Sequence, residues 1–327
     1  MINTKLKIAL LGVSHWHVPL YLPGLPENSV VAVSDDNEHV ANDYGSRYNC
    51  PAYKNYRQMI SEVKPDFVFA FAPHNQMKEV AEYLLKENIP FSIEKPAGLN
   101  AGEVETLYNY AERKRSFCAI PFVWRYSDTV NDLKTSYITS DIVHMSYKFV
   151  AGPPSRYIYT SPWMLSRKTA GGGCMTNLGV HFIDMGLYLT GSNSANILSS
   201  IYQYGKEYDI EIFASSMLRL ENGASLVLEC GYAYPMSADS KRENRWSIVT
   251  EDGYYTLADN NLEIRKLTGE PKNVPINTDS DVYYEIYTRT TLNDYITGNK
   301  PRASLKEMLI VRGILDSIDK KAIFECG

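Results

Sequence analysis

Short apolar segments without polar alternation recur along the first 120 residues of the chain. Segments of this kind are typical of strands buried on both faces of a parallel sheet. Between them, 75–86 carries an apolar stripe at helical spacing, and 100–113 begins with Asn100 as N-cap and Glu103 three residues later. Alternating strands and helices predict a doubly wound α/β sheet with right-handed crossovers. The expected strands are 7–11, 30–33, 66–71, 90–93 and 117–120.

The pattern changes after about residue 141, where strands follow one another with few helices between them. Asn222-Gly223 is a hairpin signal, and Glu251-Asp252-Gly253 indicates a second tight turn. One helix is expected at 177–189, and two more, at 283–296 and 305–320, close the chain. This order predicts a large, mostly antiparallel, open-faced sheet covered on one face. Its expected strands are 142–150, 197–204, 210–220, 224–232 and 245–250.

The two patterns imply two domains, and a chain of 327 residues is long enough for two cores. We place the boundary at Pro121, with a doubly wound parallel domain at 1–121 and an α+β domain at 122–327. The C-terminal helix, 305–320, is expected to pack back on the first domain.

Composition narrows the function classes. Apolar residues make up 44% of the chain, and the net charge is −5, which favours neither nucleic acid nor an anionic membrane surface as a partner. The five cysteines are scattered without a CxxC pair, as expected for free thiols in a reducing compartment. No signal peptide or run of about 20 apolar residues is recognised, so we expect a cytoplasmic protein.

A strand that ends at Gly12 and opens into a helix is expected to present free backbone N–H groups to a pyrophosphate. Asp35 ends the second strand, where a carboxylate binds a ribose hydroxyl, and Asp36 follows it. Together they favour NAD over NADP. Alternatively, Asp35 caps the next helix. His15 and His17 have no ligand set near them, so no metal site is expected, and we assign them to shaping the turn.

Lys95 follows a strand whose carboxyl end is expected to face the cofactor crevice. An ammonium group there can bind a substrate hydroxyl and stabilise a developing alkoxide. The alternative is a surface lysine paired with Glu94.

A second candidate region follows the glycine run 171–173. Asn177 and His181 stand four residues apart, on one face of the expected helix, and Asp184 is placed to orient the imidazole. Ahead of the glycines, 152–163 holds Arg156, Tyr157, Tyr159 and Trp163. These side chains suit a carbohydrate-like ligand, and they suit equally a domain or subunit interface.

Together these residues resemble the family of glucose-fructose oxidoreductase, inositol 2-dehydrogenase and rhizopine-catabolism MocA proteins, over most of the chain. The motifs that are specific in combination are Glu94-Lys95-Pro96 and the run from Gly171 to His181. The other carriers of the resemblance are Gly12, Asp35, Ala72-Pro73-His74-Asn75, Arg125-Tyr126, Trp163 and Asp184.

The resemblance implies a Rossmann domain with an open-faced sheet domain, and reversible oxidation of sugar, cyclitol or related alcohols with NAD(P). It implies homo-dimers or homo-tetramers formed through the C-terminal sheet, and catalytic roles for Lys95, His181 and Asn177. The cofactor-binding residues it implies are Gly12, Ser14, His15, Trp16, Asp35, Ala72, Pro73, Asn75, Glu94, Lys95 and Pro96. The substrate-binding residues it implies are Arg125, Tyr126, Tyr157, Trp163 and Asn177.

Four positions depart from the family pattern. The helix aspartate of the family falls on Asn177, a usual histidine falls on Met77, and two glycines are replaced by Ser14 and His17. Asn177 can bind a hydroxyl but cannot accept a proton at neutral pH, and losing that anion makes a charged His181 less favourable.

We therefore expect an NAD(P)-dependent dehydrogenase acting on a secondary alcohol. A dinucleotide-bound sensor without chemistry is the alternative that Asn177 and the altered turn favour. A reductase of an imine or tetrapyrrole rests on fold analogy alone.

Overall fold

The computed structural model describes residues 6–326 and divides into two compact units. The first unit contains the chain up to Pro121 and the later segments 159–163 and 281–309. The second unit contains 122–158, 164–280 and the chain from Ile310 onward. A single boundary at Pro121 does not anticipate the two later segments of the first unit.

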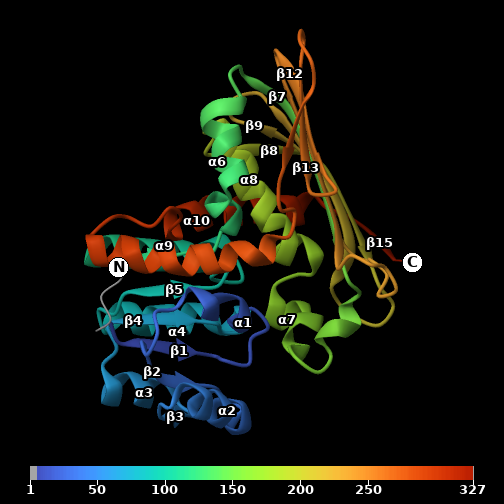
Figure 1. Ribbon diagram of the computed structural model, residues 1–327. Helices are drawn as coiled ribbons and strands as arrows, with labels where there is room; N and C mark the ends of the chain where they lie inside the picture. Colours follow the sequence, from blue (N-terminus) through green and yellow to red (C-terminus); the bar gives the residue numbers. More distant parts are fainter. Residues whose placement is uncertain (1–5, 327) are drawn as a thin grey trace. The chain divides into compact units, whose positions relative to one another are not determined.

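The first unit is built on a parallel sheet, as predicted. The sheet has six strands in the order β3-β2-β1-β4-β5-β6 (Figure 1). Its central strands β1 and β4 are completely buried, which explains their unbroken apolar sequence. The short strand β3 was not expected. The strands are β1 Ile8–Leu11, β2 Val30–Ser34, β3 Ala52–Tyr53, β4 Phe67–Ala70, β5 Phe91–Ile93 and β6 Cys118–Ala119.

Helices connect these strands, and one arrives from the C-terminal part of the chain. Asn100 caps α5 as predicted, because its Oδ1 accepts the Glu103 N–H at 3.0 Å. The late helix α9 packs against α1 and η1, where a Cβ on Gly24 would lie 2.5 Å from the Glu285 carbonyl oxygen. The helices are α1 Val18–Tyr21, η1 Leu22–Gly24, α2 Glu38–Tyr48, α3 Tyr56–Val63, α4 His74–Lys86, α5 Ala101–Lys114 and α9 Tyr283–Thr297.

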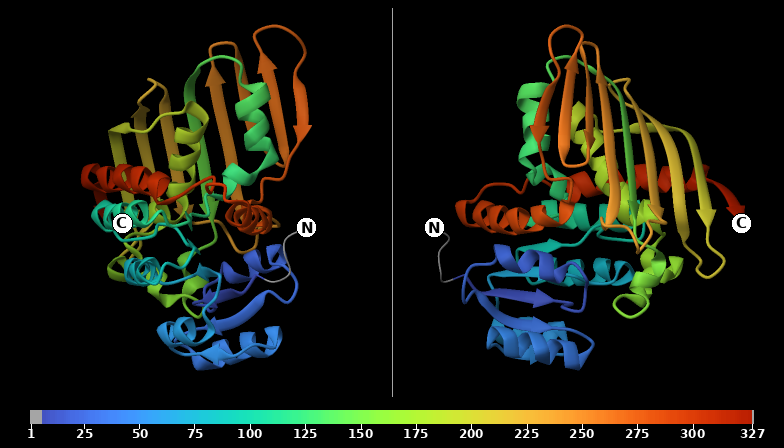
Figure 2. Two further views of the ribbon diagram at one scale, coloured as in Figure 1. Left: turned by 90° about the vertical axis from the view of Figure 1, so that its left-hand side faces the viewer. Right: turned by 45° about the vertical axis from the view of Figure 1, so that its right-hand side comes forward.

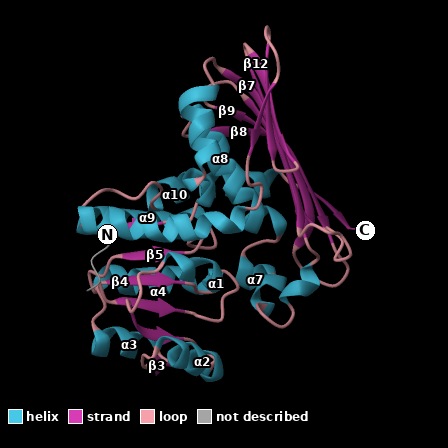
Figure 3. Ribbon diagram, viewed as in Figure 1, coloured by secondary structure: helices cyan, strands magenta, loops and turns pink. Residues whose placement is uncertain are grey.

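The second unit holds a nine-stranded sheet in the order β14-β13-β12-β11-β7-β10-β9-β8-β15 (Figure 3). Only the pairs β7–β10 and β8–β15 are parallel, so the prediction of a mostly antiparallel sheet is confirmed. Gly223, with φ at 92°, turns the predicted hairpin between β9 and β10. The strands are β7 Ile142–Ala151, β8 Ala195–Tyr204, β9 Glu211–Leu220, β10 Ser225–Tyr232, β11 Arg242–Thr250, β12 Gly253–Ala258, β13 Asn261–Lys266, β14 Lys272–Pro275 and β15 Ile323–Cys326.

Helices α6 and α8 lie on the same face of this sheet in both views (Figures 1 and 2). From α8, Phe182 packs with its ring centroid 5.4 Å from those of Tyr147 and Phe149 on β7. The short helices of this unit are η2 Val123–Tyr126, α6 Asp128–Asp132, η3 Leu133–Tyr137, η4 Pro154–Tyr157 and α7 Arg167–Ala170. They are followed by η6 Met175–Gly179 and α8 Val180–Thr190, and α10 Leu305–Lys321 begins in the first unit and continues in the second.

Candidate functional site

Gly12 ends β1 at the carboxyl edge of the parallel sheet, where ligands of doubly wound folds bind. Its φ is 78°, and a Cβ there would lie 2.4 Å from the carbonyl oxygen of Phe71, the residue after β4. Only glycine satisfies both conditions, so the position matches the first glycine of a dinucleotide-binding turn.

The turn after Gly12 corrects the expectation of free N–H groups. The helix that follows, α1, has four residues, and the turn instead folds its donors inward. The amides at these positions are therefore engaged within the protein. The engaged donors are Gly12 and Val13 to the Ser34 carbonyl, Ser14 to the Asp35 carboxylate, His15 to the Gly12 carbonyl and His17 to the His15 ring.

Asp35 is buried and braces this turn. Its two oxygens accept N–H groups from Ser14 at 2.7 Å and Asn37 at 2.9 Å. The cap of α2 is Asn37, so the alternative that Asp35 caps this helix is wrong. A carboxylate oxygen has two lone pairs, which leaves Asp35 able to accept a ribose hydroxyl as well.

A pocket of about 650 Å³ lies beside Gly12 in the first unit. Its wall includes seven of the predicted cofactor residues and Trp163, which was predicted to bind substrate. Asn75, Glu94, Lys95 and Pro96 are not among its lining residues. The predicted residues in the wall are Gly12, Ser14, His15, Trp16, Asp35, Ala72 and Pro73. Asp36 also lines the pocket. The sequence analysis did not identify five further lining residues, because they belong to no motif: Asn37, Tyr44, Lys54, Gln76 and Thr160.

Trp163 packs on the turn that follows Gly12 as part of an aromatic cluster. Its ring centroid is 4.7 Å from that of His74 and 5.6 Å from that of Trp16, on which His15 stacks at 4.0 Å. Burial, reinforced by the nearby histidines and Lys95, holds the pKa of His15 well below its usual range. His15 is therefore neutral, and because its Nδ1 accepts an N–H, its proton sits on Nε2.

Lys95 follows β5 and is 2% exposed, so it is not the surface lysine of the alternative interpretation. The preceding Glu94 is buried too, and its Oε1 lies 3.0 Å from His17 Nδ1 and 2.5 Å from the Tyr21 hydroxyl. Burial by itself raises the pKa of Glu94, but the charge and hydrogen bond of His17 and the charge of Lys95 outweigh it and bring the pKa below its usual range. The carboxylate is therefore ionised.

In the second unit, Asn177 lies on a π-helical turn, η6, where a regular helix was expected. Such turns are frequent at functional sites. The buried Asn177 amide donates to the Tyr157 hydroxyl at 3.2 Å, and Arg156 donates to the same oxygen at 2.6 Å. The structure therefore brings together two predicted substrate residues and adds a guanidinium to them.

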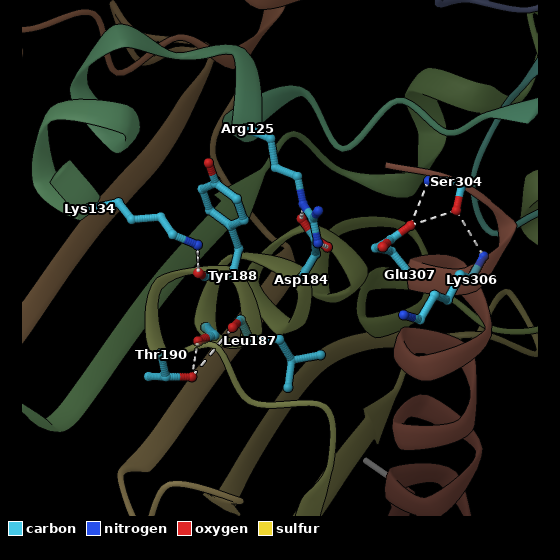
Figure 4. Close-up of polar contacts among 10 residues, drawn as sticks. Arg125, Lys134, Asp184, Leu187, Tyr188, Thr190, Ser304, Lys306 and Glu307 are labelled. Carbon is cyan, nitrogen blue, oxygen red and sulfur yellow. Dashed lines mark hydrogen bonds and ion pairs between the residues drawn. The ribbon is translucent and has the colours of Figure 1, made fainter. Parts of the chain in front are cut away.

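His181 begins the next turn, with its ring edge-on to Phe122 at 6.3 Å. Both oxygens of Asp184 accept from Arg125, at 2.9 and 2.6 Å (Figure 4). A bidentate guanidinium is a strong partner for a buried carboxylate. Arg125, predicted to bind substrate, is thus held by α8, and Tyr126 beside it is buried.

Glu211 is a site residue that the sequence analysis missed. It supports the glycine run, where a Cβ on Gly173 would lie 2.1 Å from the Glu211 carbonyl oxygen. The only sequence signal was an acidic residue at the start of an expected strand.

The parallel sheet and its pocket define a Rossmann-type dinucleotide-binding unit. The comparisons agree: residues 6–122 match the oxidoreductase family with an NAD-binding Rossmann fold, and residues 139–256 match the GFO/IDH/MocA C-terminal domain. The chain belongs to the Gfo/Idh/MocA oxidoreductase family.

Two curated relatives align over part of their length. The chain is 23% identical over 223 residues to trans-1,2-dihydrobenzene-1,2-diol dehydrogenase of Xenopus tropicalis, covering 63% of this chain and 65% of that protein. It is 22% identical over 202 residues to the rhizopine catabolism protein MocA of Rhizobium meliloti, covering 59% and 60%. The matches span less than two thirds of either relative.

Solved structures share the fold over almost the whole chain. GenD2 from gentamicin A biosynthesis, in complex with NAD, superimposes with a TM-score of 0.83 at 15% identity, covering 98% of this chain and 95% of that one. KijD10, a 3-ketoreductase from Actinomadura kijaniata in complex with NADP, gives a TM-score of 0.81 at 13% identity and covers 99% of each chain. None of the helices in residues 6–326 is long and apolar enough to cross a membrane.

Proposed function

We propose that this protein is an NAD-dependent dehydrogenase that oxidises a secondary alcohol of a sugar, cyclitol or related polyhydroxy compound. The observation that carries the proposal is the buried Lys95 at the carboxyl edge of the parallel sheet, the edge at which dinucleotides bind. An ammonium group held at this edge can donate a hydrogen bond to a substrate hydroxyl and stabilise its developing negative charge. Bound NAD supplies the hydride acceptor.

The side chains divide the remaining work. His181 is assigned the role of general base for the hydroxyl proton, and Lys95 the role of stabilising the developing negative charge of an alkoxide. Asn177, with its amide held by Tyr157, positions a neighbouring hydroxyl. Trp163 contributes to the cofactor pocket that it lines, in addition to the substrate role inferred from the sequence.

NAD is favoured over NADP by the charge of the pocket. Asp35 and Asp36 both line it, and carboxylates repel a 2′-phosphate. Lys54, also in the wall, lies 3.0 Å from the Glu38 carboxylate, which offsets its attraction for a phosphate.

A panel of polyols, aldoses and sugar acids incubated with NAD tests the proposal by the appearance of reduced cofactor. Lys95→Met is expected to abolish turnover in a protein that still binds NAD, whereas the control Lys78→Met, at a partly exposed position on α4, keeps full activity. Full activity in Lys95→Met would end the proposal.

The second candidate is a dinucleotide-bound sensor, which is favoured by the amide at position 177 and by the inward-facing donors of the turn. Tight NAD binding without turnover of any compound in the panel would support it.

The exposed face of the nine-stranded sheet supports a homo-dimer or homo-tetramer. Side chains that alternate with buried ones along the strands leave large apolar groups on this face. They are Val143, Leu198, Ile201, Met217 and Tyr254.

A further inference from the structure

His17 stands where the fingerprint has its third glycine, and its imidazole turns toward a buried carboxylate. Nδ1 lies 3.0 Å from Glu94 Oε1, so Nδ1 carries a proton and donates it to the carboxylate in both the neutral and the charged ring. Protonation of His17 therefore adds its proton at Nε2. The charge of the ring changes while the contact with Glu94 is kept.

Two of the groups around this pair keep one charge state near neutral pH. His15 is held neutral by burial, and burial together with the Glu94 charge raises the pKa of Tyr21 well above its usual range. Lys95 and Glu94 carry opposite charges. His17, with 12% of its side chain exposed, is in contact with water. The groups that face the pair are His15 from the turn, Tyr21 from α1, His74 from α4, Glu94 and Lys95 from the end of β5, and Tyr284 and Tyr287 from α9.

We propose that His17 sets the preference of this protein between the oxidised and the reduced dinucleotide. The inference rests on the proposed function in one respect, that the nicotinamide binds beside Lys95. The oxidised ring carries a positive charge and the reduced ring does not, so a charge near this position acts on one form and not on the other.

The direction follows from the charges. With His17 protonated, the three groups His17, Glu94 and Lys95 sum to +1, which disfavours the oxidised ring. With His17 neutral they sum to zero, and that penalty disappears. A rise in pH therefore strengthens binding of NAD+ relative to NADH, and by reciprocity NADH raises the pKa of His17 relative to NAD+. A role limited to packing would alter both affinities alike.

Two measurements on the full chain test this. The His17 titration, followed by NMR, is expected to have a higher midpoint with saturating NADH than with saturating NAD+, while His39, 86% exposed, titrates identically in both. The ratio of Kd for NAD+ to Kd for NADH is expected to fall about fivefold from about pH 5.5 to about pH 8.5. His17→Asn keeps a hydrogen-bond donor near the position of Nδ1 but has no titrating ring. In this variant the ratio of Kd for NAD+ to Kd for NADH is expected to stay low over the whole pH range. The control His39→Asn behaves as wild type.

Equal His17 midpoints with the two cofactors would overturn the inference, as would the wild-type pH dependence surviving in His17→Asn. The midpoint measurement uses wild-type protein and decides the matter even if the variant does not fold. If the ratio of the two Kd values changes with pH but the protein oxidises no alcohol, this inference stands and only the dehydrogenase proposal is overturned. Failure of both nucleotides to bind would overturn both.

Discussion

Glu211 accepts the backbone N–H of Met175 at 3.1 Å, linking strand β9 to the turn that carries Asn177. Burial raises the pKa of the Glu211 carboxyl from 4.5 to about 7. The folded protein therefore holds this proton at pH values where the unfolded chain has released it. The free energy of unfolding consequently falls as the pH rises from about 4.5 to about 7.

Glu211→Gln removes this dependence, because an amide oxygen accepts the same N–H without ionising. Urea unfolding should show the variant more stable than wild type by about 2 kcal/mol at about pH 8 and equal to it at about pH 4. Glu229→Gln, a half-buried glutamate on the neighbouring strand β10, serves as control. A difference of the same size at both pH values would contradict the assigned ionisation.

Asn177→Asp restores the carboxylate that the family resemblance places at this position. An anion near His181 stabilises the imidazolium, so the base form is reached only at higher pH. The acidic limb of the kcat/KM profile is expected to move up by about one pH unit. Asn177→Ala, which has no charge, should lower kcat/KM without moving that limb, and a limb unchanged in Asn177→Asp would argue against His181 as the base.

Arg125 and Asp184 form a bidentate pair that is buried in the second unit. Removing one partner leaves the other charge buried, so Arg125→Met is expected to lower the free energy of unfolding by about 3 kcal/mol. The double variant Arg125→Met with Asp184→Leu should recover much of the loss. Denaturant unfolding of the two single variants and the double variant measures the coupling, and strictly additive losses would exclude the pair as a stabilising unit.

Asp36 is a better position than Asp35 for testing the choice between NAD and NADP. Asp35 also holds the turn after Gly12, so a change there would disturb the structure of the turn as well as the charge. Asp36→Asn is expected to strengthen NADP binding about tenfold and leave NAD binding nearly unchanged, since one repulsive charge is lost. Fluorescence titration with both reduced cofactors measures this. Asp43→Asn, on α2 but outside the pocket lining, should change neither affinity.

Leu198 lies on the exposed face of the nine-stranded sheet. If copies associate through that face, Leu198→Glu buries a charge in the interface and dissociates the oligomer. Sedimentation velocity of the variant should then give a smaller species than wild type. Leu267→Glu, at a comparably apolar and more exposed position after β13, is the control that should leave the wild-type species intact.

Several features could be derived from local patterns. Continuous apolar runs mark β1 and β4, and a mostly apolar one marks β5, because both faces of these parallel strands are buried. Asn100 marks the start of α5, and Asn222-Gly223 marks a hairpin, since caps and tight turns depend on a few adjacent residues. The placement of Lys95 and Asp35 at strand ends followed from the same runs.

Contacts between distant residues could not be derived in this way. Glu94 pairs with His17, 77 residues away in the sequence, and Arg125 pairs with Asp184, 59 residues away. Trp163 reaches the pocket of the first unit across a long stretch of sequence. Periodicity reports which face of an element is apolar, but a buried charge chooses its partner by desolvation and geometry among all the groups that folding brings near it. That choice is made when the chain packs.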